Sequence, residues 1–427
     1  FRKNCDRRDV GGEKAFTGVG LKRVFLVVIF IFSLLPSSAN AVVMKNLKPV
    51  VELAYLNSDQ VSDLALTPVS IVLVGTTESA SSAWINGPLG GLSDGFIAAY
   101  TAQGAPLWNL RLGGAANEIA SSVAIDIDGS IWVVGASTSL ITPTASSTPT
   151  KVLNPDNVTL DPAQPINTPL NRIKIWQISS TGTLLNTFEF IAESVVNPKQ
   201  LLITAEGVAI IGDYYEKKEV KGFYLSVSKT GTFLPMIKYG VKSTQINSAI
   251  LNKDGSITAV GASGDLLLKT KPISKVDAVS IKISATGALQ QVARATLKST
   301  TRSWNSIDAG LLQGGKVSYS NKTEAAITKF SSLGKPTWNM RYLAKSAALV
   351  ATGKNSWASF TSSGVIKGVP AWKPKSATPV VLELGKKGEV ITSYSLTSPA
   401  VAIAANNEIG TVLITDSGVS FGLVLIN

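Results

Sequence analysis

The sequence has no histidine and only one cysteine, Cys5, in 427 residues. Without histidine the chain has no Ser–His–Asp or Cys–His nucleophile system, no imidazole ligand for a metal, and no side chain that ordinarily titrates near neutral pH. A single cysteine provides neither an intrachain disulfide nor a thiolate cluster. From these absences we expect no metal centre and no cofactor, and we assign no catalytic residue.

Charged residues are also scarce, at 16%, whereas 36 glycines punctuate the chain. This composition is typical of a β-rich protein with many tight turns rather than of one built from charged helices. Lys and Arg together number 40 against 28 Asp and Glu, which gives a formal net charge of +12. Length alone would suggest two or three domains.

An apolar run occupies residues 24–35, directly after Lys22 and Arg23, and a short polar segment then ends in Ala39-Asn40-Ala41. A basic flank, a short apolar run and an A-x-A site are typical of a secretory signal peptide, with cleavage after Ala41. The run is too short for a membrane span, which needs roughly 20 residues. We therefore expect a mature protein that has no membrane span and is secreted or otherwise extracytoplasmic, including attachment at the cell surface.

These features divide the chain into three parts. Residues 1–20 are polar and patternless and begin without Met, so we interpret them as a non-native N-terminal extension. Residues 21–41 form the predicted signal peptide. Residues 42–427 contain the internal repeats described next, and we expect them to form one monomeric domain.

One repeated signal is a hydrophobic strand whose last residue lies four positions before a glycine. Such a spacing predicts a tight hairpin with glycine at positive φ. It occurs six times, at Tyr100/Gly104, Ile178/Gly182, Val227/Gly231, Ile283/Gly287, Phe330/Gly334 and Leu384/Gly388.

A second hairpin signal alternates with the first and occurs seven times, most clearly at 122–135, 201–212 and 249–261. Seven of one type and six of the other leave one four-stranded unit incomplete. Val51–Leu56 and Phe421–Ile426 would complete it from the two ends of the chain. Each unit then averages about 55 residues, a reasonable size for a propeller blade. We predict an all-β fold, a single seven-bladed β-propeller of four-stranded antiparallel blades, closed by pairing of the N-terminal strand with the C-terminal strands.

The stretch 94–139 resembles the bacterial SBBP β-propeller repeat: a strand, a Gly turn, a Trp-bearing strand, a Gly-Gly loop, Asp-x-Asp-Gly and a V-x-G strand end. Partial copies lie at 247–261 and 330–342. The resemblance implies an exported propeller. That family is defined by its fold, and it supplies no catalytic residues to transfer.

In such a blade both types of tight hairpin lie on one face of the ring, which leaves the long connections on the other. We call the second the long-loop face. The long loops predicted for it are 76–93, 137–170, 213–220, 262–276 and 362–377. The Pro/Thr/Ser-rich loop 137–170 has too little apolar content for a core of its own. Loops that a rigid scaffold presents together are the usual place for function.

Of the eight tryptophans, Trp84 and Trp372 are expected in these loops, and Trp304 at the end of a connection between two blades on the same face. There they either clamp the loops onto neighbouring blades, or stack against sugars or anchor a protein partner. The other five are assigned to strands and to the core between blades. Lysines flank the same loops. The candidate ligand-binding lysines are Lys217, Lys218, Lys269, Lys271, Lys373 and Lys375.

A basic, tryptophan-bearing face on an exported protein favours a non-enzymatic binding or scaffold role. Its ligand would be an anionic wall polymer, an acidic polysaccharide or a protein. Nucleic acid is not expected, because no recognition module is present.

Two other interpretations stay open. One is an exported hydrolase or lyase that acts on polysaccharide through carboxylates or through Tyr214 and Tyr215. The other is a structural spacer in the envelope. Asp94, Asp277 and Glu324 recur before the third strand of their units, and we interpret this recurrence as structural. Oxygen ligands alone would suffice for calcium, but the sequence lacks a D-x-D-x-D-G loop.

Overall fold

The computed structural model describes residues 41–55, 59–80, 85–141, 166–167, 169–332 and 334–426. The predicted extension, and the predicted signal peptide up to Asn40, lie outside the described residues. So does most of the Pro/Thr/Ser-rich loop. Residues Ala41–Asn427 form one compact unit, and all of the following concerns that unit.

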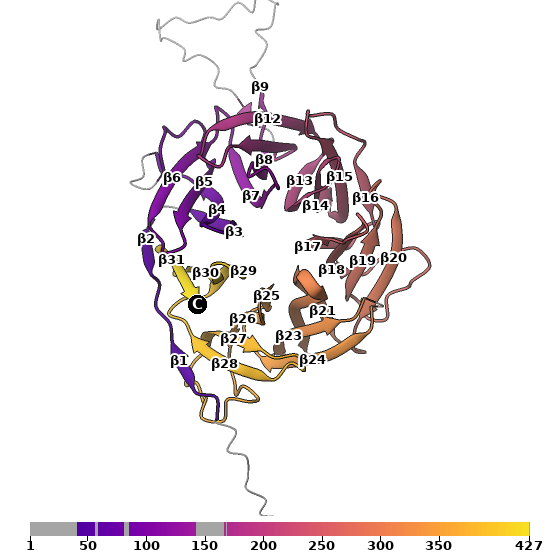
Figure 1. Ribbon diagram of the computed structural model, residues 1–427. Helices are drawn as coiled ribbons and strands as arrows, with labels where there is room; N and C mark the ends of the chain where they lie inside the picture. Colours follow the sequence, from indigo (N-terminus) through magenta and orange to yellow (C-terminus); the bar gives the residue numbers. More distant parts are fainter. Residues whose placement is uncertain are drawn as a thin grey trace, which may run out of the picture. The chain divides into compact units, whose positions relative to one another are not determined.

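Seven four-stranded antiparallel sheets, blades 1–7, stand in a ring around a central channel (Figure 1). Blade 1 contains β3 (Gln60–Leu66), β4 (Ser70–Thr77), β5 (Asp94–Thr101) and β6 (Pro106–Leu112). Blade 2 contains β7 (Glu118–Ile125), β8 (Ile131–Ser137), β11 (Arg172–Ile178) and β12 (Leu184–Ile191). Blade 3 contains β13 (Val195–Ile203), β14 (Gly207–Glu216), β15 (Glu219–Ser228) and β16 (Ile237–Tyr239). Blade 4 contains β17 (Thr244–Leu251), β18 (Ile257–Ser263), β19 (Asp277–Ile283) and β20 (Leu289–Ala295). Blade 5 contains β21 (Thr301–Asp308), β22 (Leu312–Tyr319), β23 (Lys322–Phe330) and β24 (Pro336–Leu343). Blade 6 contains β25 (Leu349–Thr352), β26 (Ser356–Ser362), β27 (Thr378–Leu384) and β28 (Val390–Ser395). Blade 7 contains β29 (Ala400–Asn406), β30 (Gly410–Asp416), β31 (Ser420–Ile426) and β2 (Val51–Ala54).

Blade 7 closes the ring from both ends of the chain, as the strand count predicts. Strand β2 pairs antiparallel with β31, with Val51 opposite Leu423 and Ala54 opposite Ser420. The sequence did not indicate β1 (Met44–Asn46), which adds a parallel fifth strand to the outside of blade 6 by pairing with β28. The segment Met44–Ala54 therefore straps blade 6 to blade 7.

The six predicted glycine turns are all present. Their glycines have φ between +72° and +90°, a region that L side chains rarely adopt. Four of these glycines lie against a large side chain on the outer strand of the preceding blade, such as Trp108 beneath Gly182 and Trp338 beneath Gly388. The turn thus needs glycine for its backbone conformation and also for the close approach of the next blade.

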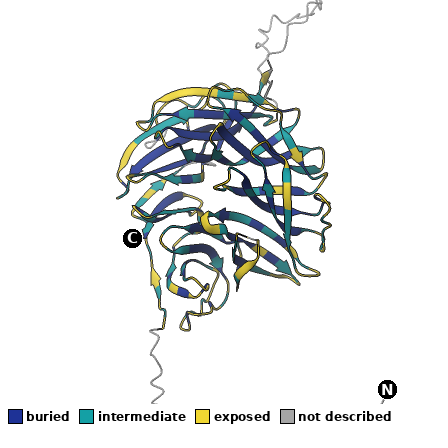
Figure 2. Ribbon diagram, turned by 45° about the vertical axis from the view of Figure 1, so that its right-hand side comes forward, coloured by how far each residue is buried: buried dark blue, intermediate teal, exposed yellow. Residues whose placement is uncertain are grey.

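The core consists of seven hydrophobic clusters among the described residues, one at each junction between neighbouring blades. The cluster that joins blade 7 to blade 1 unites Ile71 and Phe96 with Val412 and Ile414. Figure 2 shows the buried residues along the inner parts of the blades, while exposed residues gather on outer strands and turns. The closing junction is therefore packed like the other six.

Two connections differ from the predicted pattern. The predicted loop 213–220 is wrong: β14 runs on to Glu216, β15 starts at Glu219, and Lys217 at φ +56° closes a two-residue turn. A lysine- and glutamate-rich stretch suggested a solvated loop, but the hairpin extends the blade instead. A short 3₁₀ turn, η1 (Ala309–Leu311), joins β21 to β22. A two-residue ladder between β9 (Leu140–Ile141) and β10 (Ile166–Asn167) stands at the base of the blade 2 insertion.

Candidate ligand site at the channel mouth

The inner strands of six of the seven blades, blades 1–5 and blade 7, carry a β-bulge. The pairing register shifts around Ser62 in blade 1, Ser121 in blade 2, Lys199 in blade 3, Asn247 in blade 4 and Asn305 in blade 5. A bulge adds one residue to one strand and redirects its side chain. In blades 1–5 the extra residue is polar, whereas in blade 7 it is Val401, and all six border the cavities of the channel.

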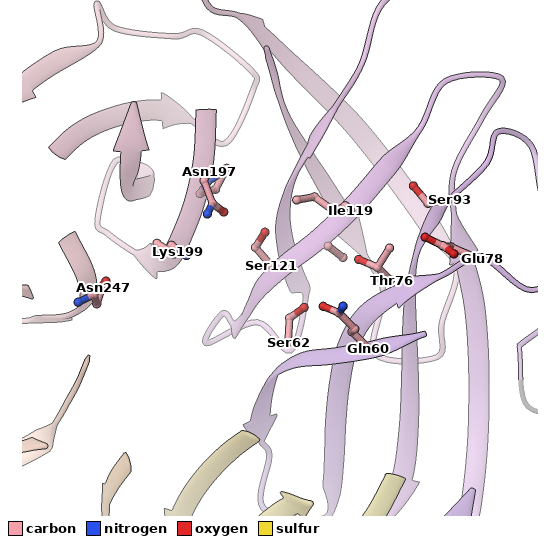
Figure 3. Close-up of a pocket in the computed structure, with 12 residues that line it drawn as sticks. Gln60, Ser62, Thr76, Glu78, Ser93, Ile119, Ser121, Asn197, Lys199 and Asn247 are labelled. Carbon is pink, nitrogen blue, oxygen red and sulfur yellow. The ribbon is translucent and has the colours of Figure 1, made fainter. Parts of the chain in front are cut away.

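The largest of these cavities, about 490 Å³, opens where the inner strands begin, on the long-loop face. Figure 3 shows Gln60 and Ser62 of blade 1 around the same space as Ser121, Asn197 and Asn247 of the following blades. Lys199 contributes the cation and Glu78 the only carboxylate among the described residues of its lining. Hydroxyls, amides and one ammonium group can hydrogen-bond a hydroxylated or anionic ligand.

A series of side-chain hydrogen bonds links the inner strands of neighbouring blades along the channel. The Ser122 hydroxyl donates to Asp63 over 2.7 Å, and the Val123 N–H donates to the same carboxyl oxygen over 3.1 Å. In the next blades, Gln200 bonds to Ser122, and the Ser248 hydroxyl donates to Gln200 over 3.1 Å. Each residue that follows a bulge is thereby tied to its neighbour, which holds the bulge residues in place.

Three carboxyl groups near the channel have pKa values raised to about 6, namely Asp63, Asp213 and Asp308, in each case chiefly through burial. Asp63 and Asp308 border a deeper cavity of about 320 Å³. Each of the three accepts backbone N–H bonds; for example, Asp213 accepts one from Ile246 over 3.0 Å. Their oxygens therefore already serve as joints between strands.

The recurring acids, which the structure places within the third strands, are paired with arginines on the outer strands. Asp94 lies 3.5 Å from Arg111, Asp277 lies 3.5 Å from Arg294, and Glu324 lies 3.3 Å from Arg341. In every pair the arginine follows its acid by 17 residues, a spacing that the sequence analysis missed. In blade 2 the same spacing recurs with the charges exchanged, between Arg172 and Glu189.

Two of these arginines, Arg111 and Arg294, also hold the long loops. Arg111 donates to the carbonyls of Ser79 and Gly87, over 3.1 and 2.9 Å, while Arg294 donates to Ser263 over 2.9 Å and to Asp265. A guanidinium group presents five donors in a fixed fork, which suits it to collect several carbonyls. The recurrence of acids in the sequence thus reflects the anchoring of loops rather than an acid–base pair.

The candidate lysines are all exposed, but they form two groups. Lys217 and Lys218 are at the tip of the β14–β15 hairpin of blade 3, and Lys269 and Lys271 are in the β18–β19 loop of blade 4. Lys373 and Lys375 are in the β26–β27 loop of blade 6, with blade 5 between the two groups. The lysines therefore do not form one continuous basic surface.

The candidate tryptophans have different surroundings. Trp84 lies outside the described residues. Trp372 is half-buried against the core cluster between blades 5 and 6. The placement of Trp304 in a loop is wrong: it belongs to the inner strand β21, is 0% exposed, and has the Arg302 guanidinium 4.3 Å from its ring. The polar run around it looked like a loop end, although it forms the wall of the channel.

Within the described ranges, no three Asp, Glu or Cys side chains gather closely enough to hold a metal ion. The same ranges contain no helix that is long and apolar enough to cross a membrane.

This architecture defines a seven-bladed β-propeller. No family model and no curated protein matches the chain. Similar solved structures include the Dos1 propeller, with 11% identity, 89% of this chain and 95% of that chain covered, and a TM-score of 0.48. A protein of unknown function from Bacteroides caccae has 11% identity, 80% and 83% coverage and a TM-score of 0.37. Drosophila Plexin A in complex with Semaphorin 1b has 9% identity, 90% and 88% coverage and a TM-score of 0.44. These similarities concern the architecture alone, and membership of the SBBP repeat family stays a prediction.

Proposed function

We propose that this protein is an exported binding or scaffold protein whose ligand enters the channel mouth on the long-loop face. The observation that carries the proposal is the 490 Å³ cavity, in which bulge residues of consecutive blades converge. Its hydroxyl and amide groups match sugar hydroxyls, and Lys199 matches a carboxylate or phosphate. An acidic polysaccharide or an anionic wall polymer fits this chemistry best.

The exposed lysines support the same ligand class. They lie on the long-loop face in two groups and would attract an anionic polymer over a distance, in a manner that weakens with salt. A protein ligand would use the same face. The predicted signal peptide, with Ala39 and Ala41 at its cleavage site, places such a polymer within reach, and N-terminal sequencing of the exported protein tests that part.

Calorimetric titration with an acidic polysaccharide tests the binding role. Lys199→Ala and Asn247→Ala should each weaken binding by roughly 5- to 30-fold, because each removes a polar contact in the cavity. Lys253→Ala is the matched control, since Lys253 is exposed in the β17–β18 turn on the opposite face. Equal affinity of all three variants for the polysaccharide would contradict the site.

One observation favours a second candidate, the carboxylate-dependent hydrolase or lyase. Asp63 and Asp308 border the deeper cavity and have pKa values near 6, within the range of a general acid or base. Release of reducing ends from a polysaccharide, lost in both Asp63→Asn and Asp308→Asn but retained in Lys253→Ala, would establish it. The bonds that already occupy these oxygens make the binding role the better interpretation.

A further inference from the structure

Blade 4 exposes an unusual number of aliphatic side chains on the long-loop face. Five of them are between 44% and 68% exposed: Val241, Leu266, Leu268, Ile273 and Leu297. They belong to three segments, 240–243, 264–276 and 296–300, which we call the blade-4 patch. Scattered single aliphatic residues on a surface are ordinary, whereas a contiguous group points to an interaction.

Hydrogen bonds join the three segments into one surface. One carboxyl oxygen of Asp265 accepts from the backbone N–H groups of Val241, Lys242 and Ser243, over 3.0, 3.1 and 2.9 Å. Burial alone would raise the pKa of Asp265, but these bonds and one from Thr244 hold it below the usual value. On the other side, the Ser274 hydroxyl donates to the Leu297 carbonyl over 3.0 Å. The three segments therefore lie side by side.

The patch is also held rigidly. The Arg294 side chain is 3% exposed, pairs with Asp277, and bonds to loop carbonyls that include Thr270. Leu267 and Thr270 exchange backbone bonds around a two-residue tip, in which Leu268 has φ +51°. A leucine in this conformation is uncommon and signals a constraint. These bonds thus fix the loop while its aliphatic side chains stay exposed.

Basic residues alternate with the aliphatic ones. Five exposed lysines belong to the patch: Lys242, Lys269, Lys271, Lys275 and Lys298. The only acid in the three segments is Asp265, 5% exposed, and the adjoining Asp277 is 0% exposed. The exposed face of the patch is therefore positively charged without compensation.

This composition discriminates between classes of partner. Protein interfaces concentrate binding energy in Trp, Tyr and Arg, and the three segments contain none of them. Stacking on sugar rings needs aromatic side chains, and the three segments contain none. Aliphatic residues that enter the headgroup layer, with lysines beside lipid phosphates, are the signature of a protein lying on an anionic membrane surface.

We propose that the blade-4 patch docks this protein on the surface of an anionic lipid bilayer. Val241, Leu266, Leu268 and Ile273 enter the headgroup region, and the lysines contact the lipid phosphates. The proposal does not depend on the ligand at the channel mouth. It would leave that opening near the membrane plane, on the same face of the ring.

A fluorescent label placed in the patch gives a direct test. In a Cys5→Ser background, Ile273→Cys carries an environment-sensitive dye, and Ile127→Cys is the matched control in the β7–β8 turn on the opposite face, where Ile127 is fully exposed. Vesicles contain either phosphatidylcholine alone or 30% phosphatidylglycerol. We expect blue-shifted, brighter emission from position 273 with the anionic vesicles, and no change from position 127.

A charge variant completes the test. Lys269→Gln combined with Lys271→Gln and Lys275→Gln should weaken the anionic-vesicle response at position 273 at least 10-fold, since each lysine contributes roughly fivefold. High salt should do the same. The proposal is overturned if the emission of the dye at position 273 does not change with anionic vesicles, or if neutral vesicles change it to the same extent. It is also overturned if the charge variant shows the same emission change as the protein with its lysines intact. A response to soluble acidic polysaccharide but not to vesicles would instead assign the patch to a polymer.

Discussion

The glycine turns allow a quantitative test of how neighbouring blades are fastened. Gly182 closes the β11–β12 turn at φ +85°, and a Cβ at this position would lie 2.6 Å from ring atoms of Trp108 in blade 1. The Trp108 indole cannot simply move aside, because its N–H donates to the Ser180 carbonyl of the same turn over 3.1 Å. Gly182→Ala therefore introduces both backbone strain and overpacking.

The size of the effect follows from these two costs. A left-handed backbone costs an L residue about 1–2 kcal/mol, and overpacking adds about 1–3 kcal/mol. Gly255 provides the control: it has φ +75° in an equally tight turn, and no atom of the described chain lies within 4 Å of its added Cβ. Gly255→Ala should therefore lower the stability only by the backbone contribution of about 1–2 kcal/mol.

Thermal unfolding, measured by calorimetry, separates the backbone contribution from the overpacking contribution. At about 2.1 cal/mol/K per residue, a folded unit of nearly 400 residues loses roughly 1 °C of Tm per kcal/mol. We expect a fall of about 2–6 °C for Gly182→Ala and about 1–2 °C for Gly255→Ala. Trp108→Ala in the Gly182→Ala background should remove the overpacking, so the two changes should combine less than additively. Equal Tm losses for the two glycine variants would refute the contact between blades.

Three further predictions concern other joints of the structure. Arg294→Lys should speed trypsin cleavage after Lys269 several-fold, because lysine cannot hold several loop carbonyls at once; unchanged cleavage would contradict the anchoring role. Asp63 has a folded pKa of about 6 against 3.8, so its protonated form is favoured by folding, and its contribution to stability should fall by roughly 2 kcal/mol as pH rises from 4 to 7. Asp63→Asn should flatten that part of the pH profile measured by urea unfolding, and a profile as steep as before would show that another group titrates. Deletion of residues 421–427 should abolish cooperative melting, since it removes β31 and leaves β2 without its partner; a sharp melting transition would disprove closure through blade 7.

The ring could be predicted from the sequence because its turns are chemically explicit. A glycine four residues after a strand end marks a turn that needs positive φ, and the count of such turns gave both the blade number and the partner of β2. Strand β1 escaped notice because three residues paired at an edge carry no distinct pattern.

The candidate site was harder to predict. A β-bulge changes the register of a strand without changing its composition, so nothing marked Ser62 or Lys199 as channel residues. Trp304 was misplaced because its strand is polar where it lines the channel, as expected for a wall that faces water. The acid–arginine pairs were detectable in principle, since each repeats at one fixed spacing.

The strap formed by β1 and β2 also determines at which stage of synthesis the ring of blades can close. The Ser420 hydroxyl bonds to Glu52, 368 positions away in the chain. During synthesis β2 emerges early and its partner β31 only after the strands of six blades. Until then the apolar faces of blades 1 and 7 remain uncovered, since each buries the other. Contacts of such long range slow folding and leave partly folded chains prone to aggregation. A newly made chain is thus most prone to aggregation before β2 pairs with β31. Substitutions in this pairing should lower the yield of folded protein before they change its final stability.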